Sequence, residues 1–254
     1  MRFIRVTAMG VFWLGSNLAL AINADEYLYV PTVTQGEREI DLYSGAGSSG
    51  ARTGAEDNAG LGFGVGITQH WFTELAVQYR KKQSLAAGLD AVEWENTFQF
   101  GEPGQWPVDV GMVFNIERPY NTGGNPLKRD STSIRFGPLL QKDFGRVQAN
   151  FNLILVDHMQ STAYREVEIR YQSQIKYRYS EPLEFGVQAF GKLGAGSQTF
   201  SSYSDQVHRV GPVVLGRFAI PGERSLSYNA ALLIGTTTHS PDRTLRVQIE
   251  YEFR

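Results

Sequence analysis

The stretch that decides the fold is the end of the chain, TLRVQIEYEFR, Thr244 to Arg254. Its apolar and polar side chains alternate, which is the period of a β-strand with two unlike faces. The apolar members are Leu245, Val247, Ile249, Tyr251 and Phe253, and the polar ones are Arg246, Gln248, Glu250 and Glu252. One such strand fits a soluble sandwich as well as a membrane barrel.

The same alternation recurs along the whole chain. It is irregular in 91–100 and mixed in 206–218, where a Gly211-Pro212 pair indicates a bend. The predicted strands are 37–42, 60–67, 74–80, 91–100, 108–117, 134–141, 147–155, 166–179, 183–193, 206–218, 226–235 and 244–254. In the second of these, glycines alternate with apolar residues at 60–67, and we interpret them as bare inward positions that let another group pack close.

The connections between these strands fall into two kinds. Every second one is tight: TQHW, GEPGQW, DFGR, SEP and PGER, with turn residues in each. Most of the others are longer, such as 47–58 and 118–132. An even strand number with short turns on one rim is typical of outer-membrane barrels. Because backbone groups in hydrocarbon must all be hydrogen-bonded, a sheet crosses a bilayer only as a closed barrel. The sequence therefore predicts an all-β, antiparallel transmembrane β-barrel of about 12 strands, with short periplasmic turns and longer external loops.

The start of the chain predicts export. Arg2 and Arg5 precede a largely apolar run to Leu20, and small residues follow, which is the layout of a cleaved signal peptide. We expect a signal peptide over 1–24, cleaved after Ala21 or Ala24, and one barrel domain over 25–254. A single anchoring helix is the alternative. With 24 basic and 26 acidic residues and no cysteine, the composition offers no thiolate chemistry, no disulfide and no reason to expect nucleic acid.

Aromatic residues near the predicted turns indicate interfacial girdles. They are Trp71, Phe72, Trp106, Tyr120, Tyr164, Tyr179, Phe218 and Phe253.

Two resemblances support this prediction. The terminal IEYEF at 249–253 resembles the last strand of Gram-negative outer-membrane proteins, which the barrel-assembly machinery recognises, although Arg254 follows the aromatic Phe253 here. The stretches at 93–104, 135–145 and 210–216 are similar to outer-membrane transporters described with the phenol-degradation MetA pathway and to related barrels. These resemblances imply a bacterial outer-membrane location, membrane lipid as surroundings, and the assembly machinery as a partner.

The charged face of the strands predicts the lumen. The candidate lumen-lining residues are Glu74, Arg80, Glu93, Glu95, Asp109, Glu117, Arg135, Glu168, Arg170, Lys176, Arg178, Glu184, Lys192, Arg246 and Glu250; the same alternation turns Glu37, Glu39, Asp41, Glu166 and Glu252 inward. Acids outnumber bases, so an open lumen is expected to favour cations. The alternative is that the charges pair across the lumen and plug it.

Two groups within this set carry alternatives of their own. Glu93 and Glu95 lie on one strand face and could hold a cation or perform acid–base chemistry, but opposed Arg or Lys is the expected fate. Arg170, Lys176 and Arg178 form either a ladder for anionic solutes or the partners of those acids.

We expect a channel, or a binder of an unidentified small solute, without catalytic residues, cofactor or metal. A lipid-modifying outer-membrane enzyme and an adhesin or receptor acting through its external loops are the alternatives. None of His70, His158, His208 and His239 has a serine at the spacing that would share a strand face.

Overall fold

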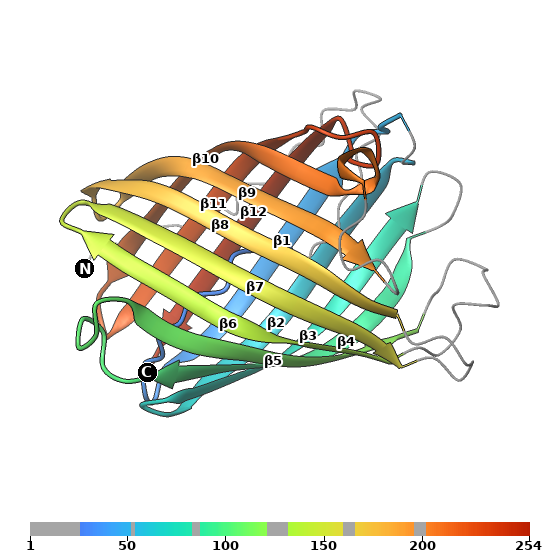
Figure 1. Ribbon diagram of the computed structural model, residues 1–254. Helices are drawn as coiled ribbons and strands as arrows, with labels where there is room; N and C mark the ends of the chain where they lie inside the picture. The colour runs from blue at the N-terminus through green and yellow to red at the C-terminus, as the bar shows by residue number, and fades with distance from the viewer. Residues whose placement is uncertain (1–25, 52–53, 83–86, 121–131, 160–165, 196–201) are drawn as a thin grey trace, which may run out of the picture.

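The computed structural model describes residues 26–51, 54–82, 87–120, 132–159, 166–195 and 202–254 (Figure 1). Within them lie twelve β-strands and a short 3-10 helix, η2 (Tyr203–Asp205). The strands are β1 (Arg38–Gly47), β2 (Glu56–Thr68), β3 (Trp71–Lys82), β4 (Gly88–Phe100), β5 (Asp109–Pro119), β6 (Thr132–Phe144), β7 (Val147–Met159), β8 (Glu166–Ser180), β9 (Leu183–Ala195), β10 (Val207–Ile220), β11 (Arg224–Gly235) and β12 (Arg243–Phe253). The expected signal peptide lies outside the described residues.

The strands form one closed antiparallel barrel. Each pairs with its neighbours in chain order, and β1 closes the ring on β12 with a register running from Arg38 opposite Phe253 to Gly47 opposite Thr244. No described helix has the length and apolar character needed to cross a membrane. The predicted fold class and strand number are confirmed.

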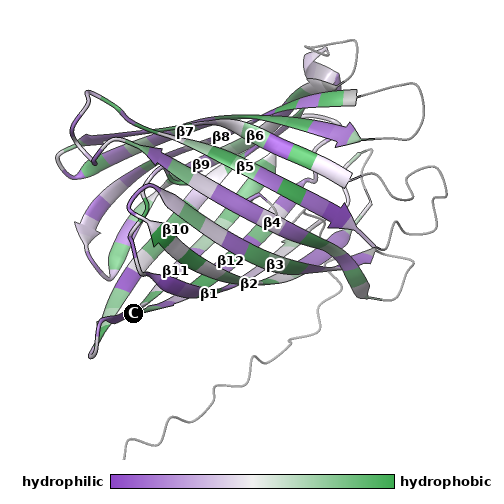
Figure 2. Cartoon of the chain, turned by 90° about the horizontal axis from the view of Figure 1, so that it is seen from below, coloured by the Kyte–Doolittle hydropathy of each residue, from purple (hydrophilic) through white to green (hydrophobic). Residues whose placement is uncertain are grey.

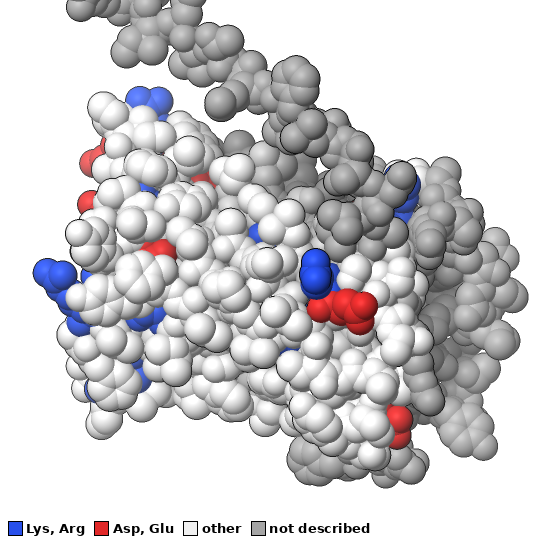
Figure 3. Space-filling view, turned by 90° about the horizontal axis from the view of Figure 1, so that it is seen from above, with Lys and Arg blue, Asp and Glu red and all other residues white. Residues whose placement is uncertain are grey.

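Hydrophobic and hydrophilic residues alternate along the strands (Figure 2), and their exposure gives an apolar outer wall and a polar inner wall. Leu42 is 52% exposed and points outward, whereas its neighbour Asp41 points inward and is buried. The space-filling view shows few charged side chains over the middle of one outer face (Figure 3). Apolar side chains exposed along whole strands are rare in water-soluble monomers, so this wall suits hydrocarbon.

The two rims differ as predicted. The tight-turn rim carries connections of two or three residues at 69–70, 145–146, 181–182 and 221–223, and one longer exception, the eight residues 101–108. The long-loop rim carries longer connections such as 48–55 and 120–131. Gly145 and Gly222 have φ of 63° and 88°, a backbone region that glycine enters without strain, which permits turns this short.

The predicted aromatic girdles are partly correct. Trp106, Tyr120, Tyr179 and Phe218 are exposed and lie near strand ends. The prediction for Phe72 was wrong, because this ring shares the inward face of β3 with Glu74 and packs over Gly64. Tyr164 lies outside the described residues.

A charge on the outer wall tests whether the barrel lies in lipid. Leu42 is midway along β1, so Leu42→Arg should lower the free energy of unfolding in phospholipid vesicles by about 2–4 kcal/mol. Trp106→Arg, on the tight-turn rim, should lower it by about 1 kcal/mol or less. Denaturant titration measures both. Equal small effects would contradict a bilayer-embedded wall.

Candidate functional site

The lumen contains a segment of the chain itself. Residues 26–37, here called the strap, precede β1 and run inside the barrel to the tight-turn rim. At that rim the strap turns at Gly36, whose φ is 80°, and pairs with β2 through Gly36 N to Gly66 O at 2.8 Å and Gly66 N to Glu37 O at 2.8 Å. A side chain at Gly66 would collide with the carbonyl of Thr34. The glycine of β2 therefore makes room for the strap, as the alternation predicted in general terms.

Amide side chains of the lumen wall hold the strap backbone. Gln172 Nε2 donates to Tyr27 O at 2.8 Å, and Gln172 Oε1 accepts from Tyr29 N at 3.1 Å. Asn152 Nδ2 donates to Tyr29 O at 2.8 Å, and Gln99 Oε1 accepts from Val33 N at 2.7 Å. An extended segment off the sheet has no ladder partner, and buried backbone groups without partners are costly. These amides replace the missing strand neighbour.

The two tyrosines of the strap anchor its side chains. Tyr27 Oη donates to Glu95 at 2.6 Å, and Asn115 Nδ2 donates to Tyr29 Oη at 3.1 Å. Burial, followed by the nearby Glu95 carboxylate, holds the pKa of Tyr27 well above its ordinary value, so its hydroxyl stays a donor. The tyrosines also join inward apolar residues of β5, β6 and β7 in one buried cluster: Tyr27, Tyr29, Val113, Leu139, Ile154 and Val156.

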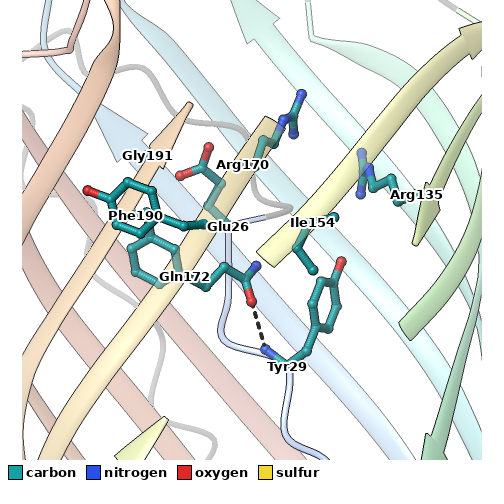
Figure 4. Close-up of a pocket in the computed structure, with 9 residues that line it drawn as sticks. Glu26, Tyr29, Arg135, Ile154, Arg170, Gln172, Phe190 and Gly191 are labelled. Carbon is teal, nitrogen blue, oxygen red and sulfur yellow. Dashed lines mark hydrogen bonds between the residues drawn. The ribbon is translucent and has the colours of Figure 1, made fainter. Parts of the chain in front are cut away.

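Two arginines hold the beginning of the strap. Arg246 is 1% exposed, and its guanidinium donates to Glu26 O at 2.5 Å, to Gln188 at 2.6 Å and to Asn229 at 2.9 Å. It also lies 5.2 Å from the centre of the Phe190 ring. Arg209 forms an ion pair with the Glu26 carboxylate. Figure 4 shows this end of the strap, with Glu26 and Tyr29 among Arg170, Gln172 and Phe190 of the wall.

The strap divides the tight-turn half of the lumen into two cavities. The acidic cavity, of about 260 Å³, faces β1, β3, β4, β10 and β12. Its lining carboxylates are those of Glu37, Glu39, Asp41, Glu74, Glu95, Glu250 and Glu252. The second cavity, of about 370 Å³, faces β7 to β12, and its lining includes Lys176, Glu184, Gln148 and Gln174. Leu28 and Val30 of the strap line both.

Many of the sequence-predicted lumen residues are ion-paired. Arg135 contacts Glu93 at 2.9 Å and also Glu117. Glu168 contacts Arg170 at 2.7 Å and Lys192 at 2.5 Å. The remaining pairs are Lys176 with Glu184 at 2.5 Å, Arg178 with Asp143 at 3.0 Å, and Arg80 with Glu56 at 3.1 Å and Asp90 at 2.6 Å. Asp109 accepts from the Gly104 amide at 2.6 Å in a rim turn.

The pair Glu93 and Glu95 has two different environments. Glu93 meets Arg135, which is the opposed base that we expected, whereas Glu95 accepts from Tyr27 and Asn115, both uncharged donors. Arg170, Lys176 and Arg178 are paired with Glu168, Glu184 and Asp143 rather than with Glu93 and Glu95. These bases lie on β8, four strands from β4 in the ring, and each has a carboxylate partner nearer to it.

The side chains of His158, His208 and His239 have polar neighbours. His208 contacts Tyr171 Oη at 2.9 Å through Nδ1 and Gln206 at 2.7 Å through Nε2. His158 lies 3.4 Å from Glu168, and His239 lies 3.9 Å from Asp205. In the part of the chain that the structure describes, no three His, Asp or Glu residues are placed to hold a metal ion.

Sequence reasoning missed the strap; of the residues that hold it, Glu95 and Arg246 were among the predicted lumen-lining set, whereas Arg209 was not. Arg209 and Arg217 were overlooked because the alternation over 206–218 is mixed. The strap itself had one signal, the spacing of Tyr27 and Tyr29 before Pro31, just after the expected cleavage sites. Two inward tyrosines ahead of the first strand indicate a segment that packs inside the barrel.

No family model matches the sequence, and no curated protein sequence matches it either. Solved structures do match. The COG4313 outer membrane channel from Pseudomonas putida F1 has a TM-score of 0.56 at 10% identity, over 92% of this chain and 99% of that one. The β domain of the Bordetella autotransporter BrkA has a TM-score of 0.54 at 13% identity, over 87% and 99%. The fold is that of an outer-membrane β-barrel. At these identities the likeness concerns the fold alone.

The Arg246 contacts predict how firmly the strap is held. The chain has no cysteine, so Leu28→Cys provides a single label on the strap. Hydrogen bonds from a charged group contribute about 1.5–3 kcal/mol each. Arg246→Gln should therefore raise the rate of maleimide labelling at that cysteine about tenfold or more. Arg178→Gln, which breaks an ion pair at the rim, is the matched control and should leave the rate unchanged; equal rates in both would contradict anchoring by Arg246.

Proposed function

We propose that the protein is a channel for small solutes in the bacterial outer membrane, closed in this conformation by its strap. On this proposal the signal peptide over 1–24 is removed after Ala21 or Ala24, and the strap then lies at the beginning of the exported chain. Folding and insertion would proceed through the barrel-assembly machinery. The proposed action is passage or binding of solutes without covalent chemistry.

The observation that carries the proposal is the lumen filling. A barrel that only served as a scaffold could fill its interior with wall side chains, as eight-stranded barrels do. Here the interior holds a segment that belongs to no strand of the wall; it is held by hydrogen bonds and an ion pair and flanked by cavities of about 260 and 370 Å³. Withdrawal of the strap would join these cavities into one polar passage.

The charges support a preference for cations. Inward bases such as Arg135, Arg170 and Lys192 are already neutralised by carboxylates. The carboxylates around the acidic cavity exceed the bases that line it, where Arg217 is the cation. Rings of acidic side chains favour cations in other pores.

Single-channel recording tests this function. In a planar bilayer, a variant lacking residues 25–33 should conduct several-fold more than the full exported chain, with cations favoured over anions. Tyr27→Ala with Tyr29→Ala keeps the chain length and should shift conductance in the same direction, because both ring anchors are lost. Correctly folded barrels that show no current without the strap, or that favour anions, would contradict the proposal.

A further inference from the structure

The acidic cavity contains like charges at directly paired positions. Along the β1–β12 register Glu39 is opposite Glu252 and Asp41 is opposite Glu250. Across β3 and β4, Glu74 is opposite Glu95. Like charges opposite each other in a sheet destabilise it unless something neutralises them. Three such pairs on four strands are an unusual arrangement for a purely structural wall.

Glycines of β2 lie between the two acidic strand pairs. Gly62 is opposite both Asp41 and Ala76, and Gly64 is opposite both Glu39 and Glu74. A side chain at Gly62 would collide with the Glu74 carboxylate, and one at Gly64 would collide with Phe72 and Glu39. The bare face of β2 therefore lets carboxylates from both sides approach a common space.

The neighbouring basic side chains do not neutralise this space. Arg217, which lines it, forms an ion pair with Glu252. Arg246 lies near Asp41, but its hydrogen bonds go to Glu26, Gln188 and Asn229. Arg135 is bonded to Glu93 and Glu117. The deficit of positive charge is thus local to the cavity.

The environment of Glu74 indicates that the cavity binds a ligand. It is 4% exposed, it lines the cavity, and its Oε1 is buried without a hydrogen-bond partner. Asp41 Oδ1 is in the same condition, although Asp41 Oδ2 accepts from Gln248 at 2.8 Å. A buried carboxylate without a donor is strongly disfavoured, so a donor from outside the chain would satisfy it.

The dimensions and walls select the class of ligand. The carboxylates are not gathered closely enough for a metal ion, since the described residues contain no such group. They are instead spread around about 260 Å³, a little below the usual size of pockets for drug-like ligands. Tyr27, Tyr29 and Phe72 supply aromatic surface, which favours organic cations.

We propose that the acidic cavity is a binding site for a small organic diammonium or polyammonium cation. One ammonium group lies between Glu74 and Glu95, and another lies between Asp41 and Glu250. The cavity is reached from the tight-turn rim, where Glu37 and Thr34 contribute to its lining. Binding at this site does not require conduction, so the binding experiment tests it separately from the proposed channel function.

Calorimetry of the refolded full exported chain in detergent tests the site. Titration with 1,4-diaminobutane and with spermidine should give saturable binding, whereas neutral 1,4-butanediol should give none. Glu74→Gln should weaken diamine binding about tenfold or more, and Glu39→Gln should weaken it in the same direction. Glu102→Gln removes one acid from an exposed turn on the same rim and should change nothing.

Three results would overturn the proposal. The first is an absence of saturable diamine binding, as expected if the carboxylates are neutralised by protons alone. The second is equal affinity in Glu74→Gln and Glu102→Gln. The third is tighter binding of Mg²⁺ than of either amine. If Glu74→Gln does not fold, Glu39→Gln and Glu250→Gln decide between these results.

Discussion

Closure of β1 on β12 is the constraint on which the rest of the molecule depends. An open sheet edge cannot lie in hydrocarbon, because its amides and carbonyls would have no partners. The pairing from Arg38 with Phe253 to Gly47 with Thr244 removes the last edge. Once the ring is closed, each strand must present one face to lipid and the other to the lumen, and the period-two pattern of the sequence follows from this requirement.

Closure also creates an interior that must be filled or hydrated. The wall of this lumen carries buried amides such as Asn115, Asn152 and Gln172, which need partners. The strap supplies them, and in turn receives the hydrogen bonds that an isolated extended segment lacks. The charges of the lumen are distributed unevenly. Most basic side chains are paired with carboxylates, whereas the acidic side chains around Glu74 outnumber the bases beside the strap. The filling of the lumen is therefore linked to the proposed function, because the strap both supplies hydrogen-bond partners to the wall and bounds the two cavities.

The architecture could be predicted from sequence because it is repetitive. Twelve alternating stretches and two kinds of connection each indicate a barrel independently. One irregular strand, such as 206–218, therefore does not change the predicted fold. The lumen could be predicted only in outline. Alternation predicted that Glu74 and Arg135 share the inner wall, but it carries no information on which strands face each other across the ring. Arg170 and Glu93 were therefore possible partners, but Arg170 pairs with Glu168 and Glu93 pairs with Arg135.

The strap was missed for a different physical reason. Its contacts are made by scattered amides and arginines on strands distant in sequence, such as Gln172 and Arg246, and no local pattern records them. Leu139 and Ile154 are apolar residues on the otherwise polar inner face, and they pack against Tyr27 and Tyr29. Departures from alternation thus indicated that a segment such as the strap packs against the inner wall, although each departure alone resembles ordinary irregularity.

The proposed function depends on the strap being bound inside a lipid-embedded barrel. Hydrogen exchange by NMR, on the full exported chain in lipid nanodiscs, tests it most directly at the amides of Tyr29 and Val33. These amides donate to Gln172 and Gln99, so they should exchange orders of magnitude more slowly than an amide in a solvated turn, and Gln172→Ala should accelerate the Tyr29 amide. Exchange of both amides at the rate of an unstructured peptide, within a folded barrel, would contradict the account.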